Sequence, residues 1–169
     1  LSLETLGFDA ATRTQLRRMA GDALFWDLVE TYLLEKPSQS FTLRHLGSGF
    51  ADFLAITSLV SADQQPWFYS IALLEYAYME SFDGLQSSIP DSSNLLDELI
   101  SLQQHVRLFR APCPAHLCGD WTDFTPASTA PSHPVWIVVS RKKSGQSVHE
   151  CVSDEEAQLL VKLVNGVHL

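Results

Sequence analysis

Cysteine is scarce in this sequence, with three residues among 169. A small and odd number of cysteines argues against a disulfide scaffold, so we expect reduced thiols and a cytoplasmic protein. No stretch approaches the ~18 consecutive apolar residues of a membrane span. The amino-terminal sequence has no basic segment followed by an apolar run, so we expect no signal peptide. The sequence begins at Leu1 without methionine, which leaves open that further residues precede it.

Positive charge is also in short supply. Charged residues make up 18% of the chain and the net charge is −9. Residues 1–100 carry 14 acidic and five basic side chains, whereas residues 101–169 carry six of each. Nucleic-acid binding depends on cationic contacts to phosphate, so the acidic first half argues against a nucleic-acid partner.

Recognisable catalytic and metal-binding motifs are missing. The sequence contains no G-x-S-x-G, no phosphate-binding P-loop and no dinucleotide fingerprint. Cys113, His116 and Cys118 have zinc-ligand side chains, but their spacing matches no zinc pattern and no second pair follows. The histidines are single and scattered, at positions 45, 105, 116, 133, 149 and 168. We therefore expect no metal or other cofactor on this chain, and no enzyme activity of its own.

The most apolar segment spans residues 67–82 and contains Glu75 in its middle. A helix here would be apolar on more than one side, which is typical of a buried helix or of one with a partner on its outer side. Glu75 must then be paired, hydrogen-bonded or protonated. We predict an interface with a partner protein that involves four aromatic residues, namely Trp67, Tyr69, Tyr76 and Phe109.

Residues 1–100 are predicted to form a helical domain. Asp9 is placed to cap a first helix through Met19, and Asp22 a second helix that ends before Pro37. The remaining predicted helices are a short one to His45, one around residues 50–54, a long one over residues 65–83, and one over residues 91–100. Pro66 suits the first turn of the long helix and Asp83-Gly84 its end.

Residues 101–169 are predicted to form a small α+β domain. The pattern indicates a strand over residues 105–110, an irregular connection over 111–134, and a β-hairpin of strands 135–140 and 147–152. Ser153 and Glu156 form a capping box for a last helix, which Asn165-Gly166 ends. The fold class is therefore α+β, an amino-terminal helical bundle followed by a β-hairpin/helix module. The open edge of a hairpin is a natural place for an extended peptide to add as a strand.

Several sequence stretches resemble the HvfC/BufC family. They are residues 32–38, the glycine- and phenylalanine-containing residues 43–54, the helix residues 73–77, the strand residues 135–138, and residues 152–160. The similarity covers about residues 24–165 and is strongest to the methanobactin-biosynthesis branch. Tyr76 stands where the family has tryptophan, and Leu73 where arginine is usual.

The resemblance implies a function as a partner subunit. Members of the family bind a TIM-barrel, multi-iron enzyme, and the pair binds a ribosomally made precursor peptide by its leader. The enzyme then oxidises cysteines of the precursor with O₂ to an oxazolone and a neighbouring thioamide, which yields a copper-chelating peptide. The iron would belong to the partner, and this chain would be an essential non-catalytic subunit.

We expect the leader to add to the edge of the predicted hairpin. The residues assigned to this site are Val135, Trp136, Ile137, Val138, Val139, Arg141, Lys142 and Lys143. The three basic residues are placed to hold acidic leader residues. Which of the two strands forms the free edge stays open at this stage.

Three alternatives stay open from the sequence. The chain could serve a different cysteine-modifying barrel enzyme with another precursor, or act as a DNA-binding or regulatory protein. The third alternative is a stand-alone enzyme that uses Cys118 or Cys151, although no base stands in a suitable context for either thiol.

Overall fold

The computed structural model describes residues 15–36, 46–84, 99–100, 102–117, 133–164 and 167–168. Over these ranges the chain is an α+β protein in which helices precede a three-stranded antiparallel sheet. The elements are α1 (Gln15–Ala20), α2 (Asp22–Glu35), α3 (Phe50–Leu54), α4 (Gln65–Asp83), β1 (Leu99–Ile100), β2 (Arg107–Ala111), the 3₁₀ helix η5 (Ala115–Leu117), β3 (Val135–Arg141), β4 (Ser147–Val152), α5 (Asp154–Val164) and β5 (Val167–His168).

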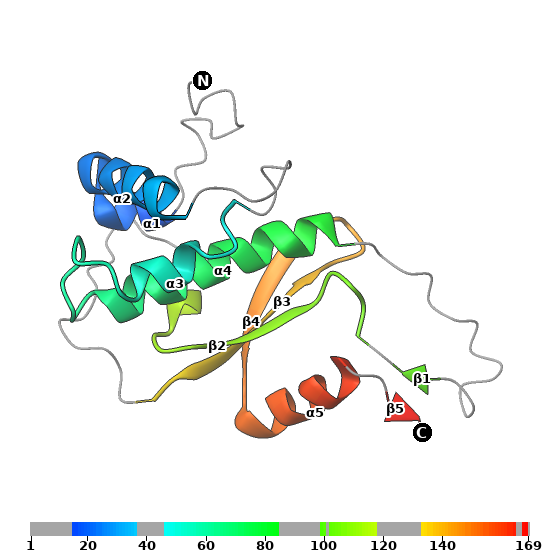
Figure 1. The fold of residues 1–169 in the computed structure, drawn as a ribbon. Helices are drawn as coiled ribbons and strands as arrows, with labels where there is room; N and C mark the ends of the chain where they lie inside the picture. The colour runs from blue at the N-terminus through cyan, green and yellow to red at the C-terminus, as the bar shows by residue number, and fades with distance from the viewer. Residues whose placement is uncertain are drawn as a thin grey trace.

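The elements are arranged in layers around α4 (Figure 1). One side of α4 lies across the sheet of β2, β3 and β4, and α1 and α2 lie on the other side of α4. Helix α5 contacts β2 and lies on the opposite side of the sheet from α4. The long helix is therefore covered on two sides, which explains why its sequence is apolar beyond a single stripe.

Helix α4 spans the residues that the sequence predicted, Gln65–Asp83, with Pro66 in its first turn. Its end is fixed at Gly84, whose N–H donates to the carbonyl of Glu80 (2.9 Å). A β-carbon on Gly84 would lie 2.6 Å from Cα of His105, so the chain approaches itself closely here. Glycine is required at this point because the backbone before β2 occupies the space of a side chain.

The turn between β3 and β4 sets the register of the hairpin. The N–H of Gly145 donates to the carbonyl of Lys142 (2.8 Å), and the N–H of Lys142 donates to the carbonyl of Gln146 (2.9 Å). Gly145 has φ 87°, so this is a three-residue loop with a glycine bulge. In the resulting antiparallel ladder, residues 148, 150 and 152 of β4 exchange hydrogen bonds with β3.

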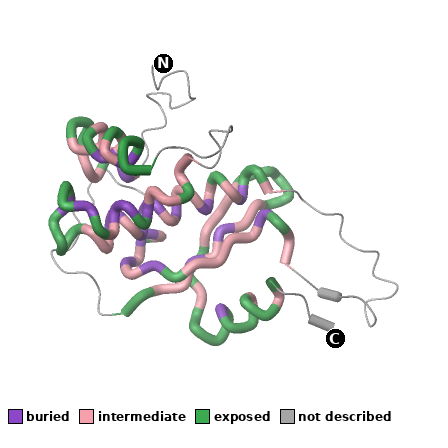
Figure 2. The backbone as a smooth tube through the Cα atoms, in the orientation of Figure 1, coloured by how far each residue is buried: buried purple, intermediate pink, exposed green. Residues whose placement is uncertain are grey.

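One hydrophobic core runs through both halves of the chain. It joins Leu28 and Leu54 of the early helices, Ile71 of α4, and Ile137 and Val139 of β3. Buried positions follow the inner sides of the helices and of the sheet (Figure 2). The sequence-based boundary at residue 100 therefore does not separate two cores.

Local predictions in the carboxy-terminal half are largely confirmed. The hairpin is present, and the capping box has both of its hydrogen bonds. The N–H of Ser153 donates to Oε2 of Glu156 (2.8 Å), and the N–H of Glu156 donates to Oγ of Ser153 (3.2 Å). The predicted strand at 105–110 is displaced to Arg107–Ala111. The irregular connection includes η5, and its residues 118–132 lie outside the described ranges.

Two predictions about helices are wrong. Leu99–Ile100 form the strand β1, which pairs with β5, rather than the end of a helix. The predicted cap of the second helix is displaced by one residue, because Gly21 stands at the N-cap and Asp22 lies in the first turn. Asp22 instead accepts a hydrogen bond from Nε of Arg17 (2.7 Å). Asp9, residues 37–45 and residues 91–98 lie outside the described ranges.

Candidate functional site

Strand β3 lies in the centre of the sheet. It pairs with β2 on one side, for example Val139 with Arg107, and with β4 on the other, for example Trp136 with Val152. The backbone of residues 135–139 therefore has no free edge for a further strand. The sequence placed the peptide site on this strand because it identified the hairpin but not the pairing of β2 with it.

The side chains of β3 alternate between two covered faces. Ile137 and Val139 are 0% exposed and belong to the core on the α4 side, where half-buried Val135 packs against them. Trp136 and Val138 are half-buried on the other face, and the guanidinium of Arg110 lies 6.0 Å from the centroid of the Trp136 ring.

Arg141 closes the end of α4. Its guanidinium donates to the carbonyl of Phe82 and to that of Gly84 (2.6 Å). Carbonyl groups at a helix carboxyl end carry partial negative charge and attract a cation. Arg141 is therefore committed to the fold, whereas Lys142 and Lys143 are exposed in the hairpin turn.

The outer side of β4 is the free edge of the hairpin. Because residues 148, 150 and 152 bond to β3, the N–H and C=O groups of Ser147, His149 and Cys151 point away from the sheet. No backbone group of the described residues pairs with these groups. They form a template for one additional strand, which the sequence could not assign to either side of the hairpin.

The side chain of His149 ties this edge to α4. Its Nδ1 accepts from the hydroxyl of Tyr78, and its Nε2 donates to the carbonyl of His116 (3.0 Å). Burial raises the pKa of Tyr78. Burial, together with the nearby His149, lowers the pKa of His116. From the sequence, the alternation of β4 predicts that His149 lies on the inner face of the sheet. Its partners could not be predicted in this way, because they come from distant segments.

The carboxyl group of half-buried Glu75 is hydrogen-bonded, as its position in the apolar run predicted. Its Oε1 accepts from the N–H of Leu16 (3.1 Å). Burial raises the pKa of Glu75 from 4.5 to about 7, against the opposing effect of hydrogen bonds from the backbone of Leu16 and Gln15. Glu75 thus holds the first turn of α1 against α4.

A second buried polar contact joins α4 to the segment after β2. Oγ of Ser70 donates to the carbonyl of Pro66 (2.7 Å) and accepts from the N–H of Cys113 (3.0 Å). Burial raises the pKa of the Cys113 thiol to about 11. Cys113 is therefore held as a neutral thiol, and Cys151 is the exposed free thiol of the described residues.

The four aromatic residues predicted for the partner interface come from two elements, three from α4 and one from β2. Trp67 is 4% exposed and belongs to the core, and Tyr69 and Phe109 are half-buried against it. Tyr76 lies beside Gly47, where a β-carbon would be 3.7 Å from its ring. The partner interface stays a prediction, because apolar residues on a helix covered from two sides do not distinguish a core from an interface.

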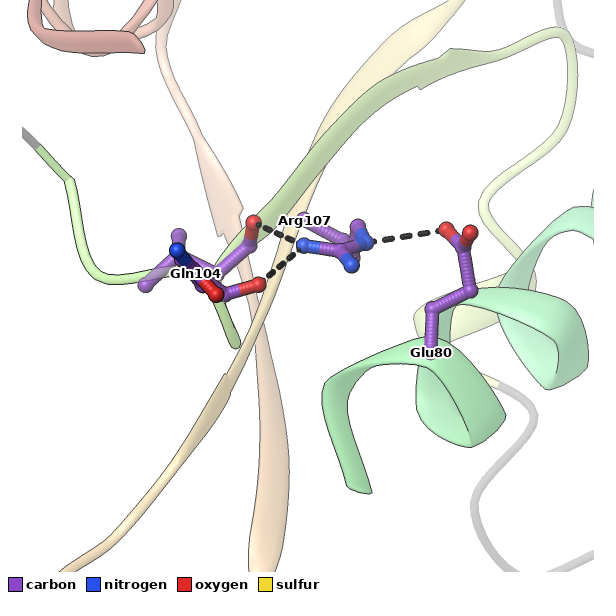
Figure 3. A network of polar contacts seen from close by, with 4 residues as sticks. Glu80, Gln104 and Arg107 are labelled. Carbon is purple, nitrogen blue, oxygen red and sulfur yellow. Dashed lines mark hydrogen bonds and ion pairs between the residues drawn. The ribbon is translucent and has the colours of Figure 1, made fainter. Parts of the chain in front are cut away.

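Arg107 of β2 links the sheet to α4. Its Nε donates to Oε2 of Glu80 (2.9 Å), and its Nη1 donates to the carbonyls of Gln104 and Val106 (Figure 3). About a third of each side chain of the ion pair is exposed. Pairs this accessible contribute about 0–1 kcal/mol, so the contact orients the segment before β2 more than it stabilises the fold.

The described ranges contain neither a metal-binding cluster nor a membrane-spanning helix. No group of three or more His, Cys, Asp or Glu side chains there is placed to hold a metal ion. No helix in those ranges has both the length and the apolar character needed to cross a membrane. Cys118, the third residue of the sequence motif with Cys113 and His116, lies outside them. No protein-family model matches the chain, and no curated protein matches its sequence significantly.

Proposed function

We propose that this chain is a non-catalytic subunit that binds the leader of a ribosomally made precursor peptide for a TIM-barrel, multi-iron partner enzyme. The observation that carries this proposal is the free edge of β4. The iron and the oxidation of precursor cysteines, of the methanobactin oxazolone and thioamide type, belong to the partner. A related enzyme acting on another cysteine-containing precursor would use this chain in the same way. We place this assembly in the cytoplasm.

The geometry of the edge suits an extended peptide. Ser147, His149 and Cys151 offer three outward N–H and three outward C=O groups in a row. Adding a strand satisfies these groups without any change in the sheet, and pockets for alternate side chains then set the register. The other outer strand, β2, is contacted by α5, and β4 is contacted by η5 through the side chain of His149.

The resemblance to the HvfC/BufC family supports the same assignment from the sequence. The stretch at residues 152–160 follows β4 directly and carries the capping box that begins α5. We further propose that helices α1 to α4 act as a bundle that faces the partner enzyme. The sheet would then present the peptide and the helices would hold the enzyme.

A proline at position 151 tests the free edge directly. Cys151→Pro removes one outward N–H of β4 and no hydrogen bond of the β3–β4 ladder, so the sheet should stay folded. Cys151→Ala is the matched control, because it removes the thiol but keeps the N–H. We expect the affinity for a labelled leader peptide of the proposed precursor to fall about tenfold for the proline variant alone, about 1.4 kcal/mol.

Fluorescence anisotropy with the labelled leader would measure both variants, and circular dichroism would show that each is folded. Equal affinities of the proline variant and the parent would rule out addition at this edge. A loss in the alanine variant as large as in the proline variant would point to the thiol instead of the backbone.

A further inference from the structure

Helix α2 has apolar residues on its outer side as well as on its inner side. Leu28 and Tyr32 are buried, and the ring of Tyr32 lies 5.0 Å from that of Phe50. On the other side, Leu34 is 77% exposed and Leu33 is 36% exposed. Helical spacing places Ala23, Trp26, Glu30 and these two leucines on one face. We call this face, with Asp27 at its margin, the outer face of α2.

Within the described ranges, no helix or strand covers the outer face of α2. Helix α2 contacts α1 and α3 and lies farther from the sheet than α4 does (Figure 1). Exposed positions follow its outward side (Figure 2). An apolar helix of 14 residues with one bare side is typical of a helix that completes its packing against another protein.

The charges on this face restrict what can bind there. Asp27 and Glu30 are exposed, as is Glu35 one turn beyond Glu30, and no ion pair joins any of the three to another described residue. The basic Arg17 is engaged with Asp22 and lies 5.2 Å from the centroid of the Trp26 ring. A ligand that covers the two leucines must therefore supply cations for these carboxylates or pay the cost of desolvating them.

We propose that the outer face of α2 docks a surface of the partner subunit in which apolar residues are flanked by Lys or Arg. This inference rests on the proposed function, in which the chain binds a larger enzyme. The side chains of Trp26, Leu33 and Leu34 supply the apolar contacts. Asp27 and Glu30 supply the charges that select the partner and its orientation.

Charge decides between this partner and other occupants of the same face. A second copy of the chain would bring Asp27 and Glu30 against their own counterparts, and like charges across an interface are costly. Nucleic acid and anionic lipid would meet the same repulsion. A basic protein surface is the class that satisfies both the exposed leucines and the unpaired carboxylates.

The test uses the chain of residues 1–169 and a TIM-barrel, multi-iron enzyme of the proposed partner class. Two variants change the outer face without touching the core, namely Leu34→Ser and the double charge reversal Asp27→Lys with Glu30→Lys. Matched controls on α5 are Leu159→Ser, at a side chain 60% exposed, and Glu155→Lys, at an exposed carboxylate. We expect each α2 variant to weaken the Kd by about tenfold or more and each control by less than about twofold, as interface and surface positions differ.

Isothermal titration at low and high salt would measure these affinities. We expect high salt to weaken the parent complex, and to weaken the charge-reversed variant less. If both α2 variants bind the partner enzyme with the same Kd as the parent chain, the docking surface is overturned and the proposed function still stands. Failure of the parent chain to bind the iron protein at all would overturn both.

Discussion

The charge of Glu75 affects how firmly the first helix is held. The carboxyl group accepts a hydrogen bond from the N–H of Leu16 but is buried between α1 and α4. Burial has the larger effect on its pKa, which rises from 4.5 to about 7. Near neutral pH the folded protein therefore keeps a carboxyl that is only partly ionised, and this couples its stability to pH.

Replacing Glu75 with glutamine should remove this coupling. At pH 4.5 and below, the carboxyl is protonated in most folded chains, and its contribution to stability is fully present. As the pH rises from 4.5 to 7, the unfolded chain loses this proton first, and about 3 kcal/mol of stability is lost. Glutamine has no proton to lose, so Glu75→Gln should not lose this stability. The free energy of unfolding of the variant minus that of the parent should therefore be larger at pH 8 than at pH 4.5, by up to about the same amount.

Urea unfolding of parent and variant at the two pH values would measure that difference. Glu155→Gln, at an exposed position on α5, is the control and should follow the parent. If the free energies of unfolding of the Glu75 variant and the parent differ by the same amount at both pH values, the raised pKa of this carboxyl is contradicted.

The sequence showed which residues carry unusual chemistry but not what they contact. Glu75 was singled out from its apolar neighbours, whereas its partner Leu16 lies 59 positions away. Arg141 was interpreted as a ligand for acidic peptide residues because it stands beside two lysines. Its actual acceptors are carbonyls at the end of α4, 57 and 59 positions earlier, and no local pattern encodes such pairs.

Elements with strong local signals were predicted well. The bounds of α4 follow from Pro66 and Gly84, and the hairpin from the turn at Lys143–Gly145. The central place of β3 could not be predicted, because β2 lies far from it in sequence and pairs through backbone groups that all residues share. For the same reason the strand pair β1–β5 was missed, and Leu99–Ile100 were assigned to a helix.

Gly84 tests how tightly α4 and β2 are joined. A β-carbon there would lie 2.6 Å from Cα of His105 and 2.8 Å from the carbonyl oxygen of Gln104, which are backbone atoms that cannot move separately. We expect Gly84→Ala to lower the free energy of unfolding by about 1–3 kcal/mol through overpacking. Thermal and urea unfolding would measure this loss.

Gly47→Ala is the matched control for that experiment. Its added β-carbon would lie 3.7 Å from the Tyr76 ring, an ordinary contact, and its φ is not positive. We expect a change within about 0.5 kcal/mol, as for most surface substitutions. A Gly84 variant as stable as the Gly47 variant would show that the two segments can separate at no cost.

Helices α1 to α4 and the three-stranded sheet share one core, although the sequence changes character near residue 100. Leucines and aromatic residues of the helices dominate the first part, and β-branched residues dominate β3. This change in composition predicts a change in secondary structure and was taken as a domain boundary. The sheet and the helices nevertheless bury their apolar sides against each other, because α4 contacts all three strands.

A fragment of residues 1–100 should therefore fail to fold by itself. It would keep α4 but lose β2 to β4, which contact α4 and share a core with buried α4 residues such as Ile71 and Leu74. Exposing large aliphatic side chains costs about 1.5–3 kcal/mol each, which a domain of marginal stability cannot sustain over a whole helix face. We expect the full chain to unfold in one urea transition, with tryptophan fluorescence and far-ultraviolet circular dichroism coinciding. The fragment should show no cooperative transition, and a sigmoidal unfolding curve for it would establish two independent domains instead.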